Sequence, residues 1–288
     1  MTHTAGTISQ TINEHTGSSL EDGGKPSLYV IKIGGNIIDD EEKLAVFLQS
    51  FATLQKGAAL ILVHGGGKLA TRLAEKAGIA QQLVDGRRIT DAETLKIVTM
   101  VYAGYINKNI VARLQANGCN AIGLSGADGN AVLAHKRIVS GNTDYGFAGD
   151  VDEVNAPLLN TLLEQGFAVV LAPVTHDKKG QLLNTNADTI AQETAKALSA
   201  LYDVSLIYSF EKSGVLLDAG DDSTVIAAIT PASYRQLKSE KKIFAGMIPK
   251  LDNAFAALGS GVKKVVIGRA EALNELIAGN AGTTIINE

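Results

Sequence analysis

The chain has 288 residues, 45% hydrophobic and 19% charged, which is enough to bury a large core as one α/β unit or two packed lobes. A formal net charge of -4 provides no overall basic field for binding nucleic acid or an anionic membrane. The apolar runs are of strand length and no secretory signal is present, so we expect a cytoplasmic protein without membrane spans. The only cysteine, Cys119, excludes an internal disulfide and is interpreted as a small buried residue.

The first part of the chain predicts a polar tail followed by two strand-glycine-helix units. Residues 1–26 have too few large apolar side chains to repay the entropy of ordering, which predicts a flexible tail. SLYVIKIGG and AALILVHGGG are apolar strands that end in glycines, and each is followed by a helical pattern. Two such units in succession are typical of a parallel sheet.

The middle of the chain continues this alternation. Thr90 and Glu93 are expected to form a capping box for a long helix over residues 91–118, which Gly118 ends. This helix is suited to line a lobe or a dimer interface. A strand, a hairpin-like segment from about 131 to 154, a helix and the buried strand FAVVLAPV follow.

The last part of the chain predicts a second lobe of the same kind. The polar loop LLNTNAD leads into an alanine-rich helix and the strand DVSLIYS. Further helices begin at Thr230-Pro231 and in GMIPK, and two strands end the chain. The predicted fold is a three-layer αβα sandwich with a mainly parallel sheet, divided into lobes at 27–180 and 181–288.

Two glycine-rich turns are candidate phosphate sites. Gly34-Gly35 and the run Gly65-Gly66-Gly67 each join a strand to a helix, where backbone N–H groups can point at an anion. Taken alone, they are also compatible with simple tight turns. The P-loop pattern fails because Leu69 follows Gly67-Lys68. A dinucleotide pattern fits the glycines, but about 20 residues later the chain has VDGRRIT in place of an acidic residue.

Four charged side chains are candidate ligand contacts. Arg87 and Arg88 offer planar forks for a carboxylate, although a lone arginine pair is usually a solvated loop. Lys32 lies in an apolar strand just before the glycines, where an ammonium is costly unless it faces an anion, so we interpret it as a phosphate-facing lysine. Lys250, in the first turn of a helix, is equally compatible with a surface lysine.

The loop NTNAD places Asn184, Asn186 and Asp188 two residues apart at the entrance to a helix. In an extended loop these side chains share one side, where they can present amides to a ligand and a carboxylate to lysines or a metal. The alternative is that Asp188 or Asn186 is the helix N-cap. Capping does not exclude a catalytic role.

The segments IKIGGN, LVHGGG, DGRRIT, INK, GDV, LLNTNAD and GMIPK resemble, in order and spacing, those of the amino-acid kinase family. DGRRIT and NTNAD are similar to the members that act on acylated glutamate. The resemblance covers the chain from about Ser27 onward. It implies Mg²⁺-escorted ATP in the C-terminal lobe, an N-acylglutamate in the N-terminal lobe, and direct transfer of the γ-phosphoryl group to the γ-carboxylate. N-acetyl-L-glutamate is the expected substrate, as in the second step of arginine biosynthesis, and N-succinylglutamate stays open.

Carried over by position, the resemblance also implies roles for individual residues. Lys32 and Lys250 would hold the transferring phosphoryl group, and Asp188 would orient the two lysines. Backbone N–H groups of the glycines would contact the phosphoryl group, and Arg88 would bind the α-carboxylate with Asn184 nearby. The implied contact residues are Gly34, Gly35, Gly65, Gly66, Arg88, Asn184 and Asn186. No protein ligand of a metal is expected.

Two departures from the family pattern qualify these expectations. SFEKSGV places Phe210, Glu211 and Lys212 where the family has a Ser/Thr-Asp-Val run, which leaves the nucleotide contacts open and allows a non-catalytic sensor as an alternative. The tail is polar, and the chain ends in AGNAGTTIINE, without the features of arginine-inhibited members. We therefore predict an arginine-insensitive homodimer.

Overall fold

The computed structural model describes residues 24–84, 87–138, 143–218, 220–240, 242–243 and 247–287. The predicted flexible tail therefore lies almost wholly outside the described residues. No helix within these ranges is long and apolar enough to cross a bilayer.

The centre of the molecule is an eight-stranded sheet in the order β12-β14-β13-β11-β1-β2-β8-β5. All neighbouring strands are parallel except β13 and β14, so the predicted mainly parallel sheet is confirmed. The strands are β1 (Ser27–Ile33), β2 (Ala59–His64), β5 (Ala121–Leu124), β8 (Ala168–Leu171), β11 (Asp203–Phe210), β12 (Ala228–Ile229), β13 (Lys264–Arg269) and β14 (Thr283–Ile285).

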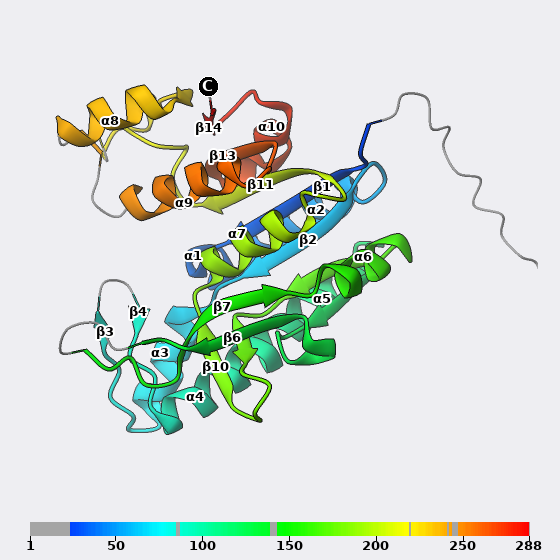
Figure 1. Ribbon diagram of the computed structural model, residues 1–288, viewed down its shortest axis with the longest axis vertical. Coiled ribbons are helices and arrows are strands. Elements are labelled where there is room, and N and C mark those ends of the chain that lie inside the picture. The colour runs from blue at the N-terminus through cyan, green and yellow to red at the C-terminus, as the bar shows by residue number, and fades with distance from the viewer. Residues whose placement is uncertain are drawn as a thin grey trace, which may run out of the picture.

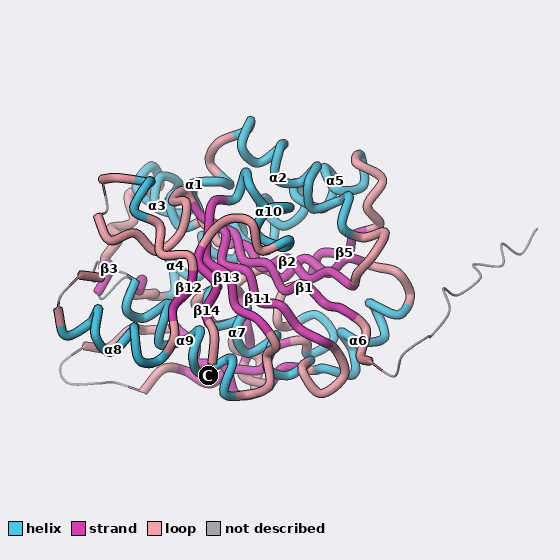
Figure 2. Tube along the Cα trace, turned by 90° about the horizontal axis from the view of Figure 1, so that it is seen from above, coloured by secondary structure: helices cyan, strands magenta, loops and turns pink. Residues whose placement is uncertain are grey.

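Both faces of the sheet are buried, which explains why its strands are apolar runs without polar alternation. In β1, Leu28 and Val30 belong to one core, whereas Ile31 and Ile33 belong to the other. Helices cover the two faces as separate layers (Figure 2). One layer holds α1 (Gly35–Ile38), α2 (Glu41–Leu54), α3 (Gly67–Lys76), α5 (Asn107–Ala116) and α10 (Leu273–Ala278). The other holds α6 (Ala156–Glu164), α7 (Ala187–Leu198), α8 (Pro231–Ser239) and α9 (Ile248–Gly259).

The predicted long helix is interrupted in its middle. It consists of α4 (Ala92–Thr99), the π-helical segment η1 (Met100–Ile106) and α5, and it ends before Gly118, which has a φ of 74°. The predicted capping box of Thr90 and Glu93 is wrong. Asp91 is the N-cap and accepts a hydrogen bond of 2.7 Å from the Thr94 nitrogen. Thr90 is buried, and its hydroxyl donates to the Arg88 carbonyl and accepts from Asn184, so it does not cap the helix.

Two smaller sheets lie beside the N-terminal half of the molecule. β6 (Val132–Lys136) and β7 (Ala148–Val154) form the predicted hairpin, and with β9 (Val174–His176) and β10 (Leu182–Thr185) they close a small barrel. β3 (Leu83–Val84) pairs with β4 (Arg87–Arg88). In Figure 1 these small sheets and the helix α4 lie at the bottom of the view, whereas α8, α9, α10 and the edge of the central sheet with β13 and β14 lie at the top.

The division into lobes at residue 180 stays a prediction. The central sheet continues across both parts, with β1 paired to β2 on one side and to β11 on the other. β10 follows residue 180 but pairs with β7 and β9. The boundary therefore falls inside a hairpin, because antiparallel pairing keeps β10 with the preceding strand.

Candidate active site

The carboxyl end of β1 brings together three charged residues that are far apart in the sequence. Lys32 leaves β1 just before the glycine turn, Asp188 lies in the first turn of α7, and Lys250 lies in the first turn of α9. The nitrogens of Lys32 and Lys250 are each 2.8 Å from a different carboxylate oxygen of Asp188. Lys250 also lies over the ring of Tyr208, 5.8 Å from its centroid.

The electrostatic environment of Asp188 keeps it ionised. Burial by itself would raise the pKa of this carboxyl, but the two ammonium groups outweigh burial and hold the pKa well below its usual range. Two positive charges thus share one negative charge at a site where the lysine side chains are only 14% and 24% exposed. The cluster thus carries an excess positive charge.

The two predicted glycine turns lie next to each other at this edge of the sheet. Gly65 donates a backbone hydrogen bond of 3.0 Å to Ile33 at the end of β1. A Cβ built on Gly35 would lie 3.9 Å from the nitrogen of Gly67. Gly34 is the residue before α1, and Gly66 is the residue before α3. The adjacent strand ends thus place both sets of backbone N–H groups at one site.

His64 supports the second turn, a role that was not predicted from the sequence. Its Nδ1 lies 2.8 Å from the Gly65 carbonyl oxygen and its Nε2 lies 3.3 Å from Asn107 Nδ2. Asn107 also donates to the Val170 carbonyl at 3.0 Å. Burial lowers the pKa of His64 to about 4, so the ring is neutral near pH 7 and Nδ1–H donates to Gly65. The sequence signal for this role was a histidine at the end of an apolar strand, directly before the glycines.

Five of the predicted contact residues line one pocket beside the cluster: Gly65, Gly66, Arg88, Asn184 and Asn186. Arg88 is 8% exposed and donates hydrogen bonds of 2.9 Å to the Gly67 carbonyl and to Thr71 Oγ1, with a further bond to Gln81. Arg88 is therefore fixed by the protein, and its alternative as a solvated loop residue is excluded. Tyr102, for which no role was predicted from the sequence, also lines this pocket.

The predicted loop NTNAD is a strand end followed directly by a helix. Asn184 lies in β10 and donates 3.0 Å to Thr90 Oγ1. Asn186 is the N-cap of α7 and accepts from the nitrogens of Asp188 and Thr189 at 2.8 and 3.2 Å. Of the two candidates, Asn186 is therefore the cap. This leaves the Asp188 carboxylate to the lysines.

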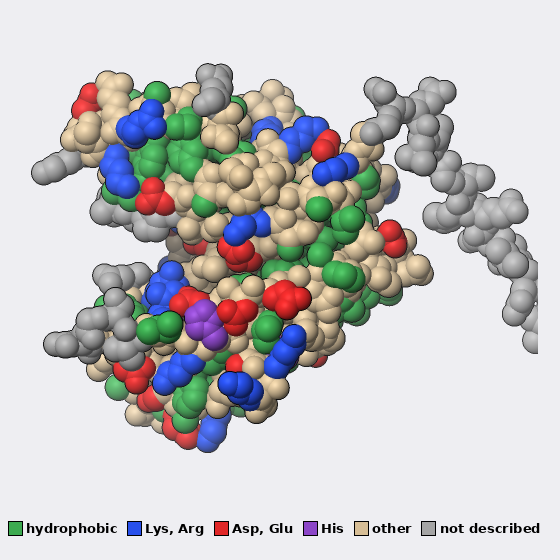
Figure 3. Space-filling model, viewed as in Figure 1, with side chains coloured by type: hydrophobic (Ala, Val, Ile, Leu, Met, Phe, Trp, Pro, Cys, Tyr) green, Lys and Arg blue, Asp and Glu red, His purple; other side chains and the backbone are tan. Residues whose placement is uncertain are grey.

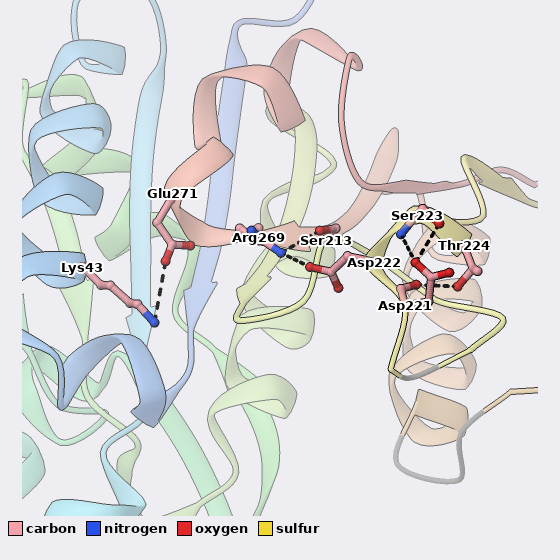
Figure 4. Close-up of polar contacts among 8 residues, drawn as sticks. All are labelled: Lys43, Ser213, Asp221, Asp222, Ser223, Thr224, Arg269 and Glu271. Atoms are coloured by element: carbon pink, nitrogen blue, oxygen red, sulfur yellow. Dashed lines mark hydrogen bonds and ion pairs between the residues drawn. The ribbon is translucent and has the colours of Figure 1, made fainter.

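The carboxyl ends of β11 and β13 form the other half of this edge. Phe210 ends β11 beside Arg269, and Arg269 donates 2.9 Å to Ser213 Oγ and also binds Asp222 (Figure 4). Asp221, in the same loop, accepts from Ser223 at 2.8 Å. The segment after Phe210 is thus held by Arg269. In Figure 3 an indentation separates the two halves of the molecule, with basic and acidic side chains on its rims.

The sequence profile of the amino acid kinase family matches residues 27–269. The chain belongs to this family. The resemblance inferred from the motifs and the predicted fold of the family are therefore confirmed.

Individual relatives of this family narrow the comparison. Acetylglutamate kinase from Cytophaga hutchinsonii is 56% identical over 261 residues, covering 90% of this chain and 98% of the relative. Acetylglutamate kinase from Bacteroides thetaiotaomicron is 54% identical over 261 residues, covering 91% and 99%. These relatives are similar to the chain over nearly their full length. Their names agree with the motifs DGRRIT and NTNAD, which indicated a member of the family that acts on acylated glutamate.

Solved structures show the same fold. N-acetylglutamate synthase from Neisseria gonorrhoeae, in complex with coenzyme A and N-acetyl-glutamate, has a TM-score of 0.77 and 25% identity, covering 91% of this chain and 60% of the synthase. Carbamate kinase from Giardia has a TM-score of 0.65 and 14% identity, covering 93% of this chain and 100% of that enzyme, which shows the fold alone.

Proposed function

We propose that this protein transfers the γ-phosphoryl group of ATP to the γ-carboxylate of N-acetyl-L-glutamate, giving N-acetylglutamyl 5-phosphate and ADP. In that role it supplies the second step of arginine biosynthesis. The observation that carries the proposal is the cluster of Lys32, Asp188 and Lys250, which lies beside two glycine turns and a pocket lined by Arg88. The acetylglutamate kinases at 54–56% identity support the choice of acceptor.

The residues divide the work as phosphoryl transfer requires. A loose transition state spreads negative charge over the phosphoryl oxygens, so catalysis needs alignment and charge cancellation more than covalent chemistry. Lys32 and Lys250 supply the positive charge, and the N–H groups of Gly34, Gly35 and Gly66 supply hydrogen bonds. Asp188 keeps the lysines in place and is not a base, because each carboxylate oxygen already contacts an ammonium. The acceptor carboxylate attacks directly, without a phosphoenzyme.

Mg²⁺ is proposed to enter with ATP. The described residues contain no group of three His, Cys, Asp or Glu side chains suited to hold a metal, and Asp188 is already bound by two lysines. The ion would therefore be held mainly by phosphate oxygens and water, which is common for Mg²⁺. We propose that ATP binds in the C-terminal lobe, at the carboxyl ends of β11 and β13.

The proposed assembly is an arginine-insensitive homodimer in the cytoplasm. Met100 and Tyr105 of η1 are 60% and 61% exposed, so the long helix presents apolar side chains that a second copy would cover. The lone cysteine, Cys119, agrees with a reducing compartment.

The test is an assay of ADP release by the purified chain with ATP, Mg²⁺ and a panel of carboxylate acceptors. We expect turnover with N-acyl-L-glutamates and none with free glutamate, aspartate or carbamate. Turnover only with another acceptor would assign a different carboxylate kinase of this fold. Binding of ATP without transfer to any acceptor would favour the sensor that the SFEKSGV segment suggested.

A further inference from the structure

Arg87 and Arg88 line the same pocket but do not face the same part of it. They are consecutive residues of β4, and successive side chains of a strand point to opposite faces. Arg88 is directed at α3, where it binds Gly67 and Thr71. Arg87 is half-buried on the other side, where it experiences the charges of Arg137, Asp150, Tyr145 and, from the lysine cluster, Asp188. One carboxylate cannot be gripped by both forks.

Arg87 carries a positive charge that Asp150 and Asp188 favour, but neither carboxylate is its ion-pair partner. Asp150 is paired with Arg137, and Asp188 is shared by Lys32 and Lys250. Across the described residues, no carboxylate is paired with Arg87. Burial and the neighbouring Arg137 lower the pKa of its guanidinium, which means that the charged form is held at some cost. Since arginine stays protonated in proteins, an anion from the ligand is the favourable partner.

The proposed reaction leaves one part of the substrate for Arg87. The γ-carboxylate must approach Lys32 and Lys250 to receive the phosphoryl group, and Arg88 is assigned to the α-carboxylate. The remaining end of the substrate is the acyl group on nitrogen. A neutral acetyl methyl would leave the half-buried guanidinium without a counter-charge.

We propose that Arg87 binds a carboxylate at the far end of the acyl group. The preferred substrate is then a glutamate acylated by a dicarboxylic acid, such as N-succinyl-L-glutamate, and Arg87 determines this specificity. The inference rests on the proposed function and revises one part of it: the transfer site and the glutamate acceptor are the same, but N-acetyl-L-glutamate becomes the weaker of two acylated substrates. It requires no change in the transfer step, since the acyl group does not react.

The test compares kcat/KM for N-succinyl-L-glutamate and N-acetyl-L-glutamate at saturating ATP and Mg²⁺. It uses the full chain, Arg87→Met, Arg87→Lys and the control Arg235→Met, which removes an exposed arginine of α8 outside the pocket. We expect the unmodified chain to prefer the succinyl substrate. Arg87→Met should lower the succinyl-to-acetyl ratio about tenfold or more, mainly through KM, as for a lost charged hydrogen bond. Arg87→Lys should keep part of the preference, and Arg235→Met should keep all of it.

Several outcomes would overturn the inference. Preference for the acetyl substrate, with a ratio unchanged in Arg87→Met, rejects it while leaving the proposed function standing. If Arg87→Met lowers kcat/KM equally for both substrates and also raises the KM for ATP, Arg87 contacts the phosphoryl group instead. Turnover of neither acylglutamate by the unmodified chain rejects both proposals. Thermal unfolding of each variant shows whether a lost activity reflects lost folding, and Arg87→Lys retains the charge if Arg87→Met does not fold.

Discussion

At the scale of single residues, the site depends on a balance of charges around Asp188. Burying a carboxylate away from water costs free energy. The lysines offset that cost because each ammonium lies 2.8 Å from an oxygen of Asp188. The same arrangement prevents the lysines from repelling each other before an anionic ligand arrives. In the proposed reaction Asp188 is therefore a positioning residue, which would act on the phosphoryl group through Lys32 and Lys250.

This balance predicts different effects for the three residues. Lys32→Ala and Lys250→Ala should each lower kcat by a factor of about 100 or more, because each removes charge that stabilises the transition state. Asp188→Asn should also lower kcat and should destabilise the fold more, because two partly buried ammonium groups lose their shared counter-charge. Steady-state kinetics and denaturant unfolding of each variant measure the two effects.

A surface lysine provides the matched control for these substitutions. Lys43 has a side chain that is 45% exposed and lies 4.0 Å from Glu271 (Figure 4). Lys43→Ala should change kcat and stability little, as is usual for an exposed ion pair. Nearly normal turnover in both Lys32→Ala and Lys250→Ala would contradict the assigned roles.

At the scale of secondary-structure elements, the turn between β2 and α3 depends on a glycine. Gly66 has a φ of 144°, a backbone angle that residues with a side chain rarely adopt. A Cβ at this position would lie 2.2 Å from Ile106 Cδ1. The close approach arises because η1 packs directly against the turn. Glycine at this position therefore reflects tertiary packing as well as ligand access.

We predict that Gly66→Ala destabilises the fold by roughly 1–3 kcal/mol, from backbone strain and the clash with Ile106. It should also lower activity, because a shifted turn misdirects the backbone N–H groups. Combining it with Ile106→Val should recover part of the stability, since the shorter side chain relieves the clash but not the strained φ. Urea unfolding curves measure these differences.

The control for the glycine substitution is Gly57→Ala. A Cβ on Gly57 would meet no atom within 4 Å, and its φ is not in the positive range. This variant should therefore keep wild-type stability within about 0.5 kcal/mol, as surface substitutions generally do. Equal stability of Gly66→Ala and Gly57→Ala would show that the turn adapts to a side chain.

At the scale of the whole molecule, we expect two copies of the chain to associate along the helix formed by α4, η1 and α5. Light scattering should give the mass of a dimer, and Tyr105→Glu should shift it toward the monomer by placing a charge among the exposed apolar residues of η1. Millimolar arginine should leave the activity unchanged. A hexamer, or strong inhibition by arginine, would contradict the predicted assembly.

Local patterns in the sequence determined much of the architecture. Apolar runs buried on both faces predicted the parallel strands, helical periodicity predicted the layers, and Gly118 marked the end of a helix. These features depend on neighbouring residues, which the sequence displays directly. The wrong N-cap at Thr90 arose because its hydroxyl is bonded to Asn184, a residue of a distant segment.

The tertiary structure alone decided which side chains meet. Three elements that are distant in the sequence carry Lys32, Asp188 and Lys250. Without the structure, only the resemblance of the chain to a family indicated that these residues lie together. Likewise, the adjacent Arg87 and Arg88 cannot be distinguished in the sequence. In the structure Arg88 is bound by α3, whereas Arg87 lines the pocket without a paired carboxylate among the described residues. Packing of the chain sets these distances and burials, because they depend on how separate elements are placed around the sheet.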